Sequence, residues 1–173
     1  NVGRSVYHSG TVGAALTARN GGITGIAISQ AVTDWGVEGQ AASDVLDQQI
    51  WSSAAEVART VTAGVIANPP DKASVLNVNV PNLPVEEMAG WRHTTVGFAP
   101  MRALAQATMV PKPGHAGSYG VDMNWGEPTP LPPETDGGAV MNGYVSLTWL
   151  GAIPTELPPP DDPAAAALKQ LFS

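Results

Sequence analysis

The chain has 173 residues, which is the length of one domain or of one domain with an appendage. Hydrophobic residues make up 43% of it, enough for a core, and a net charge of −7 with only eight Lys and Arg argues against a groove for nucleic-acid polymers. The absence of cysteine excludes disulfides, Cys-ligated zinc and a thiol nucleophile, and no apolar run is long enough to span a membrane.

The first predicted elements are a short helix and a buried strand. Ser9 is a good N-cap for an Ala- and Leu-rich helix over residues 11–19, and Asn20-Gly21-Gly22 supplies a stop signal. The apolar, β-rich run GITGIAIS, residues 22–29, is typical of a buried strand.

A second helix is predicted from Ser43 to Asn68-Pro69-Pro70, with Ser43 as its cap and the prolines as its end. Apolar residues recur at steps of three and four and form one stripe: Leu46, Ile50, Ala54, Val57, Ala58, Val61 and Val65.

The segment SVLNVNVP, residues 74–81, predicts a second strand. Its side chains alternate, so that one face carries Leu76, Val78 and Val80 and the other carries Asn77 and Asn79. Alternating helices and strands are typical of βαβ units around a parallel sheet, with the helices on its two faces. We expect the two asparagines to bond neighbouring backbone rather than substrate.

After Pro81 the sequence changes character, and we divide the chain into residues 1–81, 82–150 and 151–173. In the second part, residues 90–98 and 143–150 are predicted strands, and the proline-rich residues between them, about 99–135, predict an extended arm or a long hairpin. The third part is a proline-rich spacer followed by a short helix that begins at Pro163.

The turn Ser9-Gly10-Thr11 is the best candidate for a ligand site. Backbone N–H groups at a helix N-terminus lack partners, and the helix dipole adds about half a positive charge there. Gly10 allows close approach to the backbone, and Ser9 and Thr11 offer hydroxyl groups. This combination suits a phosphoryl group, and a plain capped helix is the alternative interpretation.

Four segments resemble the SurE family of survival-protein nucleotidases, in the same order along the chain. NVGRSVYHSGTVGAAL looks like the family segment that runs Asn-x-Gly and then Ser-Gly-Thr-Val-x-Ala-Ala. GITGIAIS and VLNVNVPNLP are similar to the family's next strand and its Leu-Asn-x-Asn-Val-Pro segment, and TDGGAVMNGYVSLTWL resembles its Thr-Asp and Gly-Tyr-Val-Ser late strand. The matches extend from residue 1 to about 150, and residues 99–130 match poorly.

This resemblance implies a metal-dependent 5′/3′-nucleotidase or acid phosphatase that releases phosphate from nucleoside monophosphates. Asn1 falls on the family's second active-site Asn, a catalytic residue that would donate its amide to the phosphoryl oxygens. Ser9, Gly10 and Thr11 fall on the phosphate-holding turn. The implied fold is α/β, with a Rossmann-like three-layer parallel core, incomplete here, and a β-rich, Pro-rich extension that exchanges arms in homodimers or tetramers. Family members are mostly cytoplasmic.

The chain departs from the family pattern in two ways. His8 stands where the family often has Tyr, and the family's metal ligands (a paired Asp, a Ser and an Asn) would all precede residue 1. The Mg²⁺ or Mn²⁺ expected for the complete protein would therefore have no ligand here, and we expect the isolated chain to be inactive. We also expect an apolar sheet edge that its own N-terminal half or a partner chain would cover.

Other interpretations remain beside this one. A serine hydrolase built on His8 and Ser9 lacks the G-x-S-x-G elbow, and His8, His93 and His115 lack metal-ligand spacing. Asp34 and Glu38 could edge a nucleoside pocket or be solvated loop carboxylates. The alternative function is an inactive fragment, or an assembly or binding protein, that retains half of the SurE-like fold.

Overall fold

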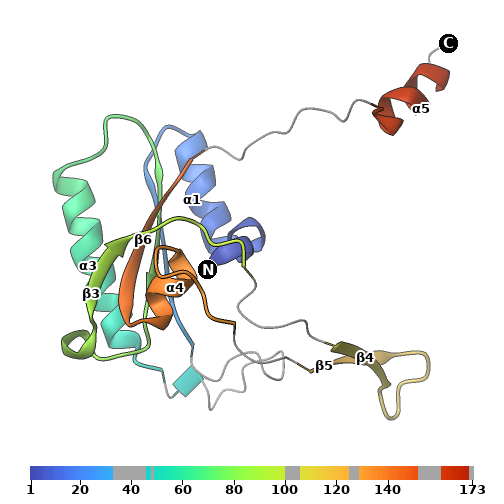
Figure 1. Ribbon diagram of the computed structural model, residues 1–173, viewed down its shortest axis with the longest axis horizontal. Coiled ribbons are helices and arrows are strands. Elements are labelled where there is room, and N and C mark those ends of the chain that lie inside the picture. Colours follow the sequence, from blue (N-terminus) through green and yellow to red (C-terminus); the bar gives the residue numbers. More distant parts are fainter. Residues whose placement is uncertain (33–45, 48, 100–105, 125–128, 152–160, 172–173) are drawn as a thin grey trace.

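The computed structural model describes residues 1–32, 46–47, 49–99, 106–124, 129–151 and 161–171 (Figure 1). Its elements in chain order are η1 (Gly3–His8), α1 (Gly10–Asn20), β1 (Gly25–Gln30), α3 (Trp51–Ala67), β2 (Val75–Val80), η2 (Val85–Glu87), β3 (Gly90–His93), β4 (Gln106–Pro111), β5 (Tyr119–Asn124), α4 (Asp136–Met141), β6 (Tyr144–Leu150) and α5 (Pro163–Leu171).

A four-stranded mixed sheet in the order β1-β2-β6-β3 forms the centre of the fold. β1 and β2 are parallel, β6 is antiparallel to β2, and β3 is parallel to β6. The predicted α/β class is therefore confirmed, and the two strands that lie in the predicted parallel core, β1 and β2, are parallel. β3 runs opposite to β2 because residues 81–89, which connect them, are too few for a parallel return, which needs a crossover of about a dozen residues or more.

Helices cover both faces of this sheet, with α1 and α3 on opposite sides (Figure 1). All six residues of β2 are buried, and its side chains alternate as predicted. Val75 packs with Val12 and Ala15 of α1. Leu76, Val78 and Val80 form the other cluster, against which Ala54, Val57, Val61 and Val65 of α3 pack. The predicted stripe of α3 is confirmed at these four positions.

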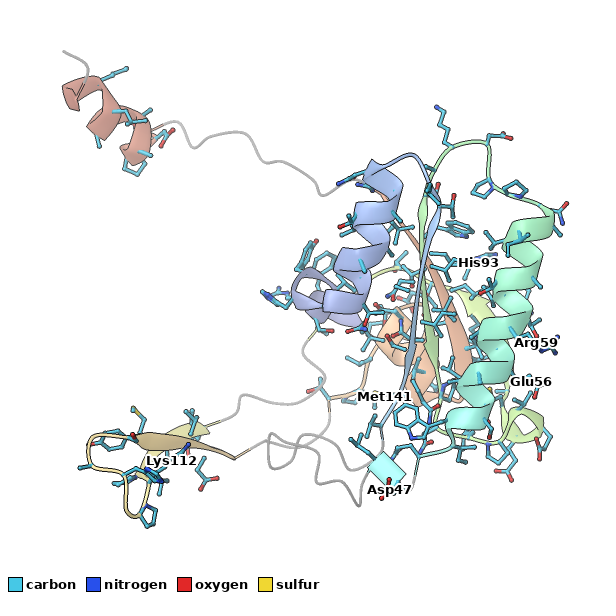
Figure 2. All side chains as sticks on the ribbon, turned by 180° about the vertical axis from the view of Figure 1, so that it is seen from behind. Asp47, Glu56, Arg59, His93, Lys112 and Met141 are labelled. Carbon is cyan, nitrogen blue, oxygen red and sulfur yellow. The ribbon has the colours of Figure 1, made fainter. Side chains whose placement is uncertain are left out.

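The start of α3 differs from the prediction. Ser43, the predicted cap, lies outside the described residues, and the long helix begins at Trp51. The N–H of Ile50 donates to Oδ1 of Asn82 at 2.9 Å, so this N–H is held by a side chain from beyond β2. Figure 2 shows Glu56 and Arg59 on the side of α3 that faces away from the sheet.

Gly25 allows α1 to lie close to the start of β1. A Cβ added at Gly25 would overlap the carbonyl oxygen, Cα and carbonyl carbon of Ala15. Any other residue would therefore push α1 away from the sheet. Because β1 runs back along α1 in the opposite direction, the first turn of α1 lies toward the carboxyl end of β1.

The arm predicted around residues 99–135 contains a hairpin in its described part. β4 and β5 pair antiparallel from Gln106↔Asn124 to Pro111↔Tyr119, and the hairpin stands apart from the sheet in Figure 1. The predicted terminal helix is present as α5, which begins at Pro163, whereas residues 152–160 of the predicted spacer lie outside the described residues. None of the helices in the described segments is long and apolar enough to cross a membrane.

Candidate anion site at the start of α1

The first turn of α1 has the geometry of a capped helix start. Ser9 is the N-cap in an extended conformation, and its Oγ accepts the N–H of Val12 at 3.1 Å. No acidic side chain lies in this turn. A Cβ at Gly10 would meet nothing within 4 Å, so there is open space beside the backbone. The N–H groups ahead of Val12 have no partner within the helix and are suited to an anion.

Asn1 lies at the carboxyl ends of the parallel strands β1 and β2. Its side-chain Nδ2 donates to Oγ of Ser29 in β1 at 2.5 Å. Its main chain is held by β2, because Nδ2 of Asn77 donates to the Asn1 carbonyl at 2.9 Å and the Asn1 nitrogen donates to Oδ1 of Asn79 at 2.9 Å. The expectation that Asn77 and Asn79 bond backbone is confirmed. Carboxyl ends of parallel strands are where α/β sheets bind ligands.

A buried carboxylate from α4 supports the segment between Asn1 and the turn. Asp136 has no exposed surface, and its Oδ2 accepts the N–H of Gly3 at 2.9 Å. Its Oδ1 accepts the N–H groups of Gly97 at 3.0 Å and Gly137 at 2.8 Å. Gly3 has φ +60, a conformation that favours glycine.

Asp136 was missed as a functional candidate by the sequence reasoning, although Thr135-Asp136 stands in one of the four family-like segments. Locally it is an acidic residue in the first turn of a short helix capped by Thr135, which is a common arrangement. Only its burial and its two bonds to distant backbone distinguish it. Burial also lowers the pKa of the Asn1 α-amino group below its ordinary value of 8.0, and the negative charge of Asp136 opposes this shift.

Ser9 also lines a cavity of about 320 Å³ that lies between α1, the residues after β3 and the end of β6. Its lining is mostly apolar, with hydroxyl groups from both sides: Val6, Tyr7, Ser9, Val12, Gly13, Leu16, Thr94, Thr95, Val96, Thr148, Trp149, Leu150 and Gly151. The volume is that of a small ligand pocket. The candidate turn therefore borders a space large enough for a small organic group.

The remaining candidates are not brought together. His8 is exposed at the end of η1, and the ring of His93 contacts Trp91 edge-on at 5.2 Å. Across the described ranges, no three His, Asp or Glu side chains form a group that could hold a metal ion. Asp34 and Glu38, considered for a nucleoside pocket, lie outside the described residues.

The fold and the site define an α/β protein whose anion-suited helix start accompanies a polar cluster at the carboxyl ends of two parallel strands. Residues 1–103 match the family model of the survival protein SurE, and this is more than half of the chain. The chain belongs to the SurE family, which confirms the resemblance found in the sequence.

Two relatives show how similar the chain is to known proteins and how much of their length it covers. The chain is 31% identical over 154 residues to a 5′/3′-nucleotidase SurE of Erwinia tasmaniensis, and the match covers 87% of this chain and 52% of that protein. It is also similar to the crystal structure of the SurE protein from Aquifex aeolicus, with a TM-score of 0.64 and 27% identity over 100% of this chain and 61% of that one. The chain thus spans only about half to three fifths of the length of these relatives.

Proposed function

We propose that this chain supplies the phosphate-binding turn of a SurE-type phosphomonoesterase acting on nucleoside 5′- or 3′-monophosphates. The observation that carries the proposal is the Ser9-capped start of α1 together with Asn1 at the carboxyl ends of β1 and β2. The name of the Erwinia relative, a 5′/3′-nucleotidase, supports the substrate class.

In this proposal each residue of the turn has a separate role. The N–H groups of Gly10 and Thr11 and the Thr11 hydroxyl donate to the phosphoryl oxygens, while Ser9 keeps the turn in its capped conformation. Asn1, the proposed catalytic residue, turns its amide from Ser29 to the same oxygens. Negative charge grows on these oxygens in the transition state, so fixed donors aimed at them accelerate the reaction.

We further propose that the complete site uses Mg²⁺ or Mn²⁺, which activates water for such hydrolysis. The described residues of this chain do not fit a metal ion, because no three carboxylate or imidazole groups converge. We therefore assign phosphate binding to this chain and no step that involves the metal. The ligands would come from residues outside the described ones, and the described part by itself would bind phosphate without turnover.

We also propose that the protein forms a homodimer or tetramer through its β-rich part, residues 82–150, and, as the resemblance to the family implies, that it works in the cytoplasm. The β4–β5 hairpin supports the assembly, since a two-stranded hairpin has marginal stability on its own. Met109 and Val121 pair across it, and 66% and 64% of their surfaces are exposed. A second copy of the chain would bury this pair.

The test is binding of inorganic phosphate to the full chain by calorimetry, together with hydrolysis of 5′-AMP and 3′-AMP in Mn²⁺ or Mg²⁺. Thr11→Val should weaken phosphate binding about tenfold, as expected for one lost charge-assisted bond. Thr17→Val is the matched control and should bind phosphate normally, because Thr17 lies on the same helix and its hydroxyl donates to the Gly13 carbonyl. A wild-type chain that assembles without binding phosphate would support the alternative of an assembly protein.

A further inference from the structure

We propose that Asn77 and Asn79 are positioning residues for Asn1. This inference rests on the proposed function, since it concerns how the same site is held in shape. Both side chains stand on the α1 side of the central strand β2, and both contact Asn1 through its main chain.

The two asparagines hold opposite ends of one residue. Asn77 donates to the Asn1 carbonyl and Asn79 accepts from the Asn1 nitrogen, each at 2.9 Å. Such a pair of bonds resembles the pairing of a neighbouring strand, but side chains supply it. The backbone of Asn1 is thereby fixed against β2, which leaves its own amide directed at Ser29 and the carboxyl end of the sheet.

The burial of these amides indicates that they are not present for stability. Asn77 is 0% exposed and Asn79 is 2% exposed, in a strand whose other four residues are Val and Leu. Within the described part of the chain, Oδ1 of Asn77 and Nδ2 of Asn79 have no hydrogen-bond partner. An unpaired buried polar atom destabilises a fold, so apolar residues of the same size would serve the core better. The two side-chain amides instead hold the main chain of Asn1 in position.

The neighbouring strand offers a matched control at Ser146. In the sheet register Asn79 lies beside Ser146 and Asn77 beside Thr148, and both hydroxyl residues are buried on the same face. They bond to Thr94 rather than to Asn1. Ser146→Ala therefore removes a buried polar group at the same depth without touching Asn1, and Thr148 is left unchanged because it lines the cavity beside Ser9.

The experiment measures two quantities on the full chain and on the variants Asn77→Leu and Asn79→Leu: the affinity for inorganic phosphate and the urea midpoint of unfolding. We expect phosphate affinity to fall at least tenfold in both Leu variants while the midpoint stays the same or rises. In the control Ser146→Ala we expect phosphate affinity to change less than twofold. Phosphate affinity that falls only in step with the urea midpoint, in the control and the Leu variants alike, would overturn the inference.

A second measurement separates this inference from the proposed function. The side-chain amide signals of Asn1, observed by nuclear magnetic resonance with ¹⁵N-labelled asparagine, should shift in both Leu variants and stay in place in the Ser146→Ala control. If the wild-type chain binds no phosphate, the proposed function fails, and the Asn1 signals alone decide whether Asn77 and Asn79 position it. Unchanged Asn1 signals in the Leu variants would contradict the positioning role.

Discussion

The carboxylate of Asp136 accepts the backbone N–H of Gly3 at 2.9 Å, although the two residues are 133 positions apart in the chain. Through this bond α4, which precedes the last strand of the sheet, fixes the beginning of η1. The same carboxylate accepts from Gly97 after β3. One buried side chain thus joins three segments that lie around the candidate site.

We expect Asp136→Asn to lower the free energy of unfolding by about 1–3 kcal/mol, because one backbone N–H would then face an amide NH₂ in the core. Urea unfolding followed by circular dichroism measures the change. Asp162→Asn is the control, since Asp162 accepts the N–H of Ala164 at an exposed helix start and an amide oxygen can replace it. An equal loss of unfolding free energy in both variants would show that the burial of Asp136 is not the cause.

Two glycines should respond in opposite directions to the same substitution. Gly64→Ala, inside α3 with nothing within 4 Å of a new Cβ, should stabilise the chain by about 0.5–1 kcal/mol through helix propensity. Gly25→Ala should destabilise it, because the new Cβ would overlap the Ala15 backbone. Thermal unfolding of the two variants side by side checks this prediction. A stable Gly25→Ala variant would contradict the close contact of α1 with β1.

Replacing the exposed pair Met109 and Val121 by lysine should shift the protein toward monomer. The two side chains lie opposite each other on the hairpin, so two like charges would oppose burial against a second copy. Sedimentation velocity gives the mass before and after. Thr108→Lys, which lies on the other face of the same hairpin strand, should leave the oligomeric state unchanged. A wild-type chain that is already monomeric would refute the proposed assembly.

Divalent metal should not stabilise this chain by itself. The described residues hold no set of three metal-ligating side chains. Mn²⁺ at 1 mM (roughly the upper range of dissociation constants for a specific site) should therefore leave the unfolding midpoint unchanged. Inorganic phosphate at the same concentration should raise it. Thermal unfolding in each additive provides the comparison, and a clear rise with Mn²⁺ would place ligands within this chain.

The sequence by itself determined the local elements and the family. Ser9 as a cap, the alternation along β2 and the apolar stripe of α3 were all predicted, because capping and side-chain period depend on residues within a few positions of each other. The start of α3 was less predictable, since Asn82 from another part of the chain takes the N–H of Ile50.

The tertiary structure decided the strand directions and the supports of the site. Whether β6 runs parallel or antiparallel depends on which ends of the sheet its connections reach, and no local pattern records this. The amides of Asn77 and Asn79 and the carboxylate of Asp136 were visible in the sequence, but their partners Asn1 and Gly3 are 76 to 133 positions away. Only folding brings these groups together, because a buried polar group bonds to whatever backbone lies beside it.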